Sequence, residues 1–296
     1  MRSWGRATLL LAAGLVLGLT LGVRFAQVAE RNLNKFGYSA WTEPNKVVTR
    51  NRPDRAVAYK QFDSRGKRGS LFLHIFDPLP GSPTRSRTIM LVHGGNWDTG
   101  SPTHLFRQCR VLAREGYGCI SASYRIRSIH GTDPLTALRD VRDAMAYAGT
   151  NLKGLGLPNA EFWVGGTSAG GQLVLTSATT FMPEHDFKPV PVDGMILFNP
   201  VLDTSEGTRF YRFTKDFSPK FSPAVGVEAL DVPVLIVNGG NDHVTPHGTA
   251  RSMAEKLRAG GADVELEIYP GVGHGFFSYA RFDVVNERML GFLQDH

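Results

Sequence analysis

The chain has 296 residues, of which 42% are hydrophobic and 20% are charged, so it is long enough to bury the core of one large α/β domain. Its formal net charge is +6, and half of that excess comes from three N-terminal arginines, Arg2, Arg6 and Arg24. The remaining charges are nearly balanced, and no basic run is interleaved with aromatic residues. This composition argues against a nucleic-acid-binding protein.

The N-terminal residues have the pattern of a targeting segment. Arg2 and Arg6 precede an uninterrupted apolar run over residues 7–23. A run of this length is long for a secretory signal and short for a membrane-spanning helix, so both a cleaved signal peptide and an N-terminal membrane anchor over residues 1–29 remain open. In either case we expect the rest of the chain, residues 30–296, to be exported to the periplasm or secreted.

Hydrophobic periodicity predicts a hairpin and then alternating strands and helices. Two alternating runs, residues 57–62 and 70–76, flank a turn and predict an antiparallel hairpin. The strands that follow are expected at residues 88–93, 118–123, 161–165, 194–199, 233–238 and 263–269, and the helices at 102–115, 134–148, from 168, 245–259 and up to 293. This order predicts an α/β fold with a mostly parallel sheet, an N-terminal antiparallel hairpin and helices on both faces. Residues 204–227 lack periodicity and are expected to form a short lid-like insert.

A G-x-S-x-G pentapeptide, Gly166 to Gly170, lies between the predicted strand 161–165 and a helix-forming run. In this context the serine, Ser168, occupies a strained turn, and the glycines on either side avoid steric clashes. The start of a helix favours negative charge, so Ser168 is the candidate nucleophile.

Two adjacent glycines follow the predicted strand 88–93, in the sequence His93-Gly94-Gly95-Asn96-Trp97. Consecutive glycines let backbone N–H groups converge on a developing oxyanion, and this motif occurs together with the serine turn. We therefore expect the N–H groups of Gly94, Gly95 and Ala169 to form an oxyanion hole, with His93 in a structural role.

An acid and a histidine follow two late strands. Asp242 comes after the strand 233–238 and is the candidate acid, although Asp203 also follows a strand. His274 follows the strand 263–269, lies between glycines and completes the chain order Ser, Asp, His. The sequence thus predicts that Asp242 orients His274, which acts as the general base.

Metal and disulfide chemistry were also considered. His243 and His247 have i, i+4 spacing, but Pro246 between them disrupts a helix and no third ligand appears, so no metal site is expected. Cys109 and Cys119 lie on apolar stretches. They are expected as small buried thiols, while a disulfide stays open because export would permit one.

Taken together, these motifs resemble those of the α/β-hydrolase superfamily, in its serine esterase branch, over roughly residues 55–296. They stand here as HGGNW at 93–97, YR at 124–125, GTSAGG at 166–171, NGGND at 238–242 and GVGHGFF at 271–277. More narrowly, the chain is similar to bacterial esterases described as acetylxylan- or feruloyl-esterase-like, including a helix that carries an acid near Asp140. The usual third glycine of the first motif is Asn96 here.

The resemblance implies a carboxylic ester hydrolase that acts through an acyl-enzyme on small or carbohydrate-linked acyl esters, without a cofactor or metal. Its implied catalytic residues are Ser168, Asp242 and His274. Candidate substrate contacts are Trp97, Phe210, Tyr211 and Phe276. The aromatic residues of the insert either form a wall for the substrate or pack onto the core.

Two other functions share features of this sequence. A peptidase of the prolyl-oligopeptidase type shares the order of the three residues, but 296 residues leave no room for its large N-terminal propeller. A non-catalytic binding protein on this fold would usually lack one of the three, and all are present. The sequence leaves the acyl and alcohol groups and the oligomeric state undetermined.

Overall fold

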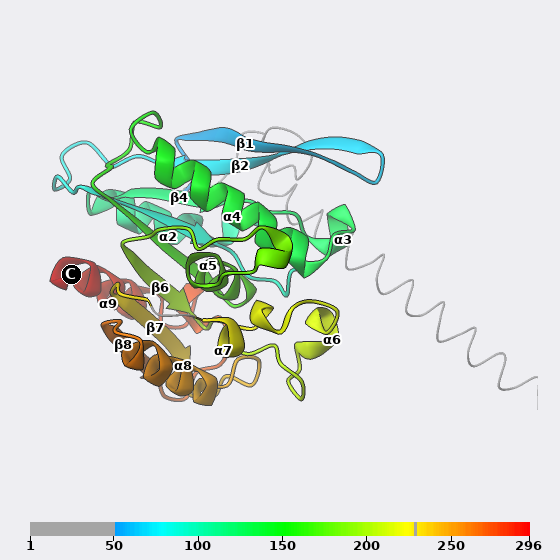
Figure 1. Cartoon of the computed structure of the whole chain (residues 1–296). Helices are drawn as coiled ribbons and strands as arrows, with labels where there is room; N and C mark the ends of the chain where they lie inside the picture. Colours follow the sequence, from blue (N-terminus) through cyan, green and yellow to red (C-terminus); the bar gives the residue numbers. More distant parts are fainter. Residues whose placement is uncertain (1–50, 228–229) are drawn as a thin grey trace, which may run out of the picture.

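The computed structural model describes residues 51–227 and 230–296, so the expected signal or anchor segment lies outside the described residues. One eight-stranded sheet runs through the molecule in the order β1-β2-β4-β3-β5-β6-β7-β8 (Figure 1). The strands are β1 (Arg55–Ser64), β2 (Lys67–Phe76), β3 (Arg87–Val92), β4 (Gly118–Ala122), β5 (Glu161–Thr167), β6 (Gly194–Phe198), β7 (Val234–Gly239) and β8 (Val264–Tyr269). Strand β2 is antiparallel to β1 and β4, and the other neighbouring pairs are parallel. The predicted α/β sheet with an N-terminal hairpin is confirmed.

Helices cover both faces of this sheet. The α-helices are α2 (Phe106–Arg114), α3 (Arg127–His130), α4 (Pro134–Asn151), α5 (Ala169–Thr179), α6 (Tyr211–Thr214), α7 (Pro223–Gly226), α8 (His247–Ala259) and α9 (Phe282–Asp295). Apolar residues of α4, α5 and α8 belong to one core cluster, whereas those of α2 and α9 belong to the other. The two layers are separated by the sheet, as predicted.

Strand β3 shows why the central strands are apolar throughout. Successive side chains of a strand point to opposite faces, so Met90 and Val92 pack in the core cluster of α4, α5 and α8. Ile89 and Leu91 pack in the cluster of α2 and α9. All four side chains are fully buried. A strand between two helical layers therefore needs apolar residues at every position, which produces a continuous run instead of an alternating one.

Some helices differ from the prediction in their limits. The single helix expected over residues 102–115 begins as a 3₁₀ turn, Pro102–Leu105, and continues as α2. The Thr103 N–H of this turn donates to the Ser101 hydroxyl. Helix α4 extends to Asn151, three residues beyond the expected end. Helices α3, α6 and α7 have four residues each and were not predicted, because such short helices carry too few residues to show a period.

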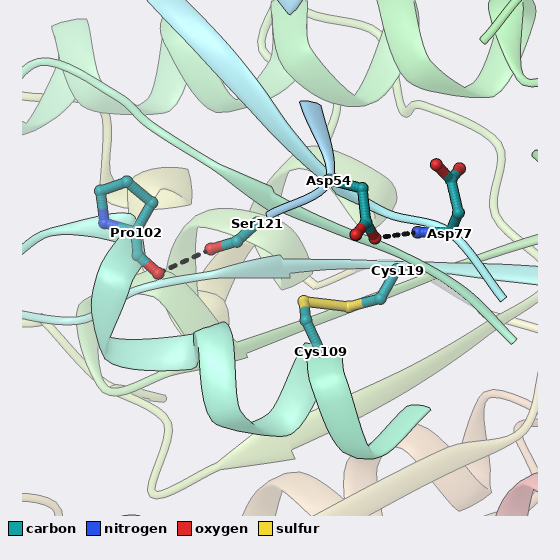
Figure 2. The surroundings of a disulfide bond; sticks show 6 residues. All are labelled: Asp54, Asp77, Pro102, Cys109, Cys119 and Ser121. Atoms are coloured by element: carbon teal, nitrogen blue, oxygen red, sulfur yellow. Dashed lines mark hydrogen bonds between the residues drawn. A yellow bond between two sulfur atoms is a disulfide. The ribbon is translucent and has the colours of Figure 1, made fainter. Parts of the chain in front are cut away.

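A disulfide joins the helical layer to the sheet. Cys109 of α2 is bonded to Cys119 of β4, and their Cα atoms are 5.2 Å apart (Figure 2). The expectation of two free buried thiols is therefore wrong. Sequence periodicity placed one cysteine on a helix and the other on a strand, but only the packing of α2 against β4 brings them within bridging distance. Nearby, the Ser121 hydroxyl donates to the Pro102 carbonyl at 2.9 Å and fixes the start of the same helical segment.

Every helix in the described part of the chain is too short or too polar to cross a lipid bilayer.

Candidate active site

Ser168 lies at the turn between β5 and α5 with φ 53° and ψ −121°, a strained conformation for a residue with a side chain. The flanking glycines are required by close contacts. A Cβ atom on Gly166 would lie 2.5 Å from the backbone carbon of Gly170, and one on Gly170 would lie 2.3 Å from the carbonyl oxygen of Val92. The turn therefore has the geometry that the pentapeptide predicts, with the serine at the N-terminus of a helix.

Asp242 and His274 form a hydrogen-bonded pair. The distance from His274 Nδ1 to Asp242 Oδ2 is 2.8 Å. Four further donors hold the carboxylate, which is itself buried: the N–H groups of Val244 and Thr245, the Thr245 hydroxyl and the Asn199 amide, all at 2.8–2.9 Å. An acid held by this many donors has a fixed position and orients the imidazole.

The surroundings also fix the charge of the acid. Burial by itself would raise the pKa of Asp242, but the hydrogen bonds from His274 and Thr245 and the neighbouring His274 ring outweigh burial, and the pKa lies below its ordinary value. A charged carboxylate only accepts hydrogen bonds, so the proton of this contact belongs to His274 Nδ1. The other ring nitrogen, Nε2, is then available as a proton acceptor.

The loops after β7 and β8 are joined directly. The Asn241 N–H donates to the Val272 carbonyl at 2.9 Å, and a Cβ atom on Gly239 would lie 2.5 Å from that same oxygen. Asp203, the alternative acid, instead accepts hydrogen bonds from the Ser205 N–H and hydroxyl and does not contact His274. Of the two acids considered from the sequence, the structure brings Asp242 to the histidine.

Backbone contacts connect the serine turn to this pair. The Ser168 N–H donates to the Phe198 carbonyl at 3.0 Å, and the Ser168 carbonyl accepts from Val201 at 2.9 Å. Asn199, which holds Asp242, lies between these two residues. Within the described residues no hydrogen bond joins Ser168 Oγ to His274 Nε2. Such contacts are often long in the absence of substrate and shorten in the complex.

The glycine loop packs against the serine. A Cβ atom on Gly94 would lie 2.9 Å from Ser168 Cβ, so only glycine allows this approach. Gly95 has φ 121°, and Asn96 follows at φ 54°, a left-handed conformation that asparagine tolerates better than most residues. Among the described residues, the N–H groups of Gly94, Gly95 and Ala169 donate no hydrogen bond to another group. This is the arrangement expected of oxyanion donors before substrate binds.

The His93 side chain supports this glycine loop. Its ring is fully buried, stacks on Tyr124 at 4.3 Å between ring centres, and lies with Nδ1 2.8 Å from the Gly94 carbonyl oxygen. The Tyr124 hydroxyl donates to the His93 carbonyl at 3.0 Å. The next residue, Arg125, forms a bidentate ion pair with the fully buried Asp140 of α4. The YR pair thus anchors the glycine loop to the helical layer, and His93 has the structural role predicted.

Trp97 connects the glycine loop to the insert over residues 204–227. It is buried, adopts φ 58°, and donates from Nε1 to the side-chain oxygen of Gln172 at 3.1 Å. The Gln172 amide donates in turn to the Phe221 carbonyl at 2.9 Å. Phe210 packs edge-on against Trp97 at 5.9 Å. Trp97, Phe210 and Phe221 therefore occupy packing positions that hold the insert on the core.

The two other candidate substrate contacts, Tyr211 and Phe276, lie in different parts of the structure. Tyr211 is half-buried and lines a hollow of about 240 Å³ formed within the insert. Phe276 is fully buried in the core cluster of α2 and α9, where its ring packs beside Tyr269. Phe276 therefore packs in the core and does not contact substrate, because a side chain that is fully enclosed by other core residues has no surface for a ligand.

Three residues that hold the site were not predicted from the sequence, namely Asn199, Thr245 and Gln172. A signal existed for Thr245, because a hydroxyl residue three positions after an aspartate often bonds with it in a turn. Asn199 and Gln172 gave no local signal for their roles at the site, since Asp242, Trp97 and Phe221 lie far from them in the chain. His247 begins α8 directly after Pro246, and the described residues contain no group of three or more His, Cys, Asp or Glu that could hold a metal ion.

A parallel sheet with this serine turn and with an acid and a histidine on later loops defines an enzyme of the α/β-hydrolase class. Comparisons with known proteins agree with this class. Residues 89–218 match the family described as alpha/beta hydrolase fold, and residues 159–289 match the dienelactone hydrolase family. The chain therefore has the fold of the α/β-hydrolases.

The individual proteins that match the chain include several esterases. The chain is 30% identical over 220 residues to esterase LipC of Mycobacterium tuberculosis, a match covering 66% of this chain and 54% of that protein, so it spans about half of LipC. It is 26% identical to the ethyl acetate hydrolase of Pseudomonas putida, covering 70% and 71% of the two chains. A butyrate-bound thermophilic esterase of Thermogutta terrifontis has a TM-score of 0.71 and 28% identity, over 83% of this chain and 95% of that one. These similarities support carboxylic ester hydrolase activity.

Proposed function

We propose that this protein hydrolyses carboxylic esters through a covalent acyl-enzyme on Ser168. The observation that carries the proposal is the strained serine at the start of α5, together with the Asp242–His274 pair on the loops that follow β7 and β8. A serine hydroxyl is a weak nucleophile until a neighbouring base removes its proton. His274 has Nε2 available for that step, because Nδ1 is committed to Asp242.

In the proposed mechanism Ser168 Oγ attacks the ester carbonyl while its proton passes to His274 Nε2. The N–H groups of Gly94, Gly95 and Ala169 stabilise the negative oxygen of the tetrahedral intermediate. The intermediate collapses, the alcohol leaves with the proton from His274, and the acyl group stays on Ser168. Water then attacks this acyl-enzyme with His274 as base, and the acid is released.

The substrate is proposed to be either a small acyl ester or an acyl ester linked to a carbohydrate. The esterase of Thermogutta terrifontis has been solved with butyrate and with propionate bound, and the relative from Pseudomonas putida is an ethyl acetate hydrolase. These relatives support short acyl chains. Carbohydrate-linked esters, including acetyl and feruloyl esters of a polysaccharide, come from the resemblance of the motifs.

The test is hydrolysis of p-nitrophenyl acetate, butyrate and octanoate, acetylated xylan and methyl ferulate. We expect Ser168→Ala to lower kcat by about 10⁵-fold or more and Asp242→Asn by about 10³- to 10⁴-fold, as in other serine hydrolases. Ser177→Ala is the matched control, because Ser177 is a buried serine of the same helix. Its activity should stay within about twofold of the wild type.

A covalent probe tests the nucleophile separately. The esterase of Thermogutta terrifontis has been solved phosphorylated by paraoxon. We expect paraoxon to inactivate this protein and to leave a diethylphosphoryl group on the peptide that contains Ser168, read by mass spectrometry. A folded wild type that neither hydrolyses any of these esters nor reacts with paraoxon would refute the proposal.

We also propose that the chain is exported, either with residues 1–29 removed or with residues 7–23 as a membrane anchor. The apolar run after Arg2 and Arg6 supports this. The Cys109–Cys119 disulfide supports it independently, because disulfides persist mainly in oxidising compartments.

A further inference from the structure

A second hollow lies beside the proposed catalytic residues, between the loop after β6 and the start of α8. Its volume is about 290 Å³. The residues that line it belong to the loop after β6, the first part of the insert, the loop after β7 and the start of α8. It is therefore distinct from the hollow inside the insert, with which it shares no residue.

Three of these lining residues touch the proposed machinery directly. The Val201 N–H donates to the Ser168 carbonyl at 2.9 Å. The Thr245 hydroxyl donates to Asp242 at 2.8 Å and lies 3.3 Å from His274 Nδ1. Phe210 packs against Trp97 of the glycine loop. The hollow thus adjoins the nucleophile turn, the acid and the glycine loop together.

The walls of the hollow are mostly apolar. Val244 and Pro246, which are partly exposed, and Phe210 contribute carbon surface, whereas Val201 and Leu202 line the hollow from buried positions. The one carboxylate among the lining residues, Asp203, accepts hydrogen bonds at Oδ1 from Ser205 and Ser222 of the insert. A pocket with these walls favours an apolar group over a charged one or a sugar.

Two of the exposed lining residues, Arg209 and His243, are polar. Arg209 is exposed and donates from Nη1 to the His243 carbonyl at 3.3 Å, so it joins the two walls of the hollow. The volume is far larger than the methyl group of an acetate requires. A ring or a branched chain would remove much more apolar surface from water, and burial of such surface is the main source of affinity in a pocket of this kind.

We infer that this hollow is a subsite for an apolar, ring-sized group of the ester substrate. The inference rests on the proposed esterase function and specifies its substrate class as esters with one small and one bulky apolar side. The bulky group belongs either to the acyl or to the alcohol part of the ester, and the chemistry of the pocket is the same for both.

The experiment fills the hollow with a larger side chain. Thr249 lies on α8, half-buried in the wall, so Thr249→Phe adds volume without changing a loop. Thr249→Val loses the same hydroxyl, which donates to the Pro246 carbonyl, but adds no bulk. Thr208→Phe fills the hollow from the opposite wall and guards against a folding defect of the first variant. Val225→Phe adds the same bulk to the hollow inside the insert and serves as the external control.

Two ester series identify the part of the substrate that is bound. One varies the acyl group, with p-nitrophenyl acetate, hexanoate and benzoate. The other varies the alcohol, with ethyl, cyclohexyl and 2-phenylethyl acetate. The quantity compared is the ratio of kcat/KM for the bulky ester to that for the small ester within each series.

In one of the two series, we expect the bulky-to-small ratio of kcat/KM to be at least about tenfold lower in Thr249→Phe than in Thr249→Val. The same ratio should also fall in Thr208→Phe. Hydrolysis of the small ester should stay measurable in both filling variants. Val225→Phe should keep the wild-type ratio. Unchanged ratios in both filling variants would overturn the subsite, while the esterase function would still stand. A wild type without activity on every ester would instead refute the proposed function itself.

Discussion

Burial determines how His93 behaves. Its ring is fully enclosed, and the loss of solvation, helped by the nearby His104 and His74, lowers its pKa to about 3 despite the contact with the Gly94 carbonyl. His93 is therefore neutral at every pH near neutrality. A neutral ring that stacks on Tyr124 fits a support for the glycine loop and not a group that transfers protons.

This burial predicts a loss of stability in mild acid. An unfolded histidine binds a proton below its ordinary pKa of about 6.5, whereas native His93 does not until about pH 3, so the free energy of unfolding falls as the pH drops through that window. One such residue contributes a loss of about 2 kcal/mol between pH 7 and pH 5. His93→Gln should remove the part of the acid-induced loss of stability that comes from His93. The part that comes from His74, whose pKa burial also lowers to about 3, should remain.

The measurement is urea unfolding of both proteins at pH 7 and pH 5. The drop in unfolding free energy should be smaller in His93→Gln by about 2 kcal/mol. The lowered pKa of Asp242 acts only in stronger acid, below its ordinary value of 3.8, so it does not affect this comparison. An equal drop in the two proteins would show that His93 becomes protonated in the native state.

At the scale of elements, the layer formed by α2 and α9 is attached to the sheet covalently. The disulfide links Cys109 of α2 to Cys119 of β4, and both side chains are fully buried. Strand β4 lies between β2 and β3, and the Tyr124–Arg125 pair begins two residues after its end. The bond therefore fixes the helix to the strand whose following residues support the glycine loop.

Removal of this bond should lower stability with little effect on the site. For the double variant Cys109→Ala, Cys119→Ala we expect a loss of about 3 kcal/mol, because a closed loop of about ten residues restricts the unfolded chain by that amount. The check is the unfolding midpoint in urea, together with kcat on p-nitrophenyl butyrate. Dithiothreitol should destabilise the wild type but leave the variant unchanged, and an equally stable variant would contradict the expectation.

At the scale of the whole molecule, the parallel part of the sheet gathers the site. Strands β3, β5, β6, β7 and β8 are neighbours in that order, so the loops at their carboxyl ends meet at one edge (Figure 1). The insert over residues 204–227 leaves from the same edge and is fixed on the core through Trp97 and Gln172. The site thus uses residues separated by up to 180 positions, from Gly94 to His274.

The proposed export gives a prediction for the whole chain. Expressed in a bacterium, the full-length protein should leave the cytoplasm and carry oxidised Cys109 and Cys119, because the oxidising compartment maintains the disulfide. A variant without residues 2–29 should stay in the cytoplasm with both thiols reduced. Thiol labelling under denaturing conditions reads this difference, and the mass of the exported chain distinguishes a cleaved signal from an anchor. Cytoplasmic retention of the full-length chain would exclude export.

The sequence by itself determined the fold class and the order of the elements. Hydrophobic periodicity is a local property, so it predicted the hairpin and the alternating strands and helices. Local chemistry also predicted the serine turn, because the glycines around Ser168 are needed within five residues. The choice of Asp242 and His274 followed from their positions after strands, since loops at the carboxyl edge of a parallel sheet converge.

Only the tertiary structure decided the contacts between distant segments. It joined Cys109 to Cys119, gave Asp242 its additional partners Asn199 and Thr245, and placed Gln172 between Trp97 and the insert. It also enclosed Phe276 in the core, although that residue lies two positions from His274. These outcomes depend on how helices pack on the sheet, and the physical reason is that burial and hydrogen bonding across the core involve partners that no local pattern specifies.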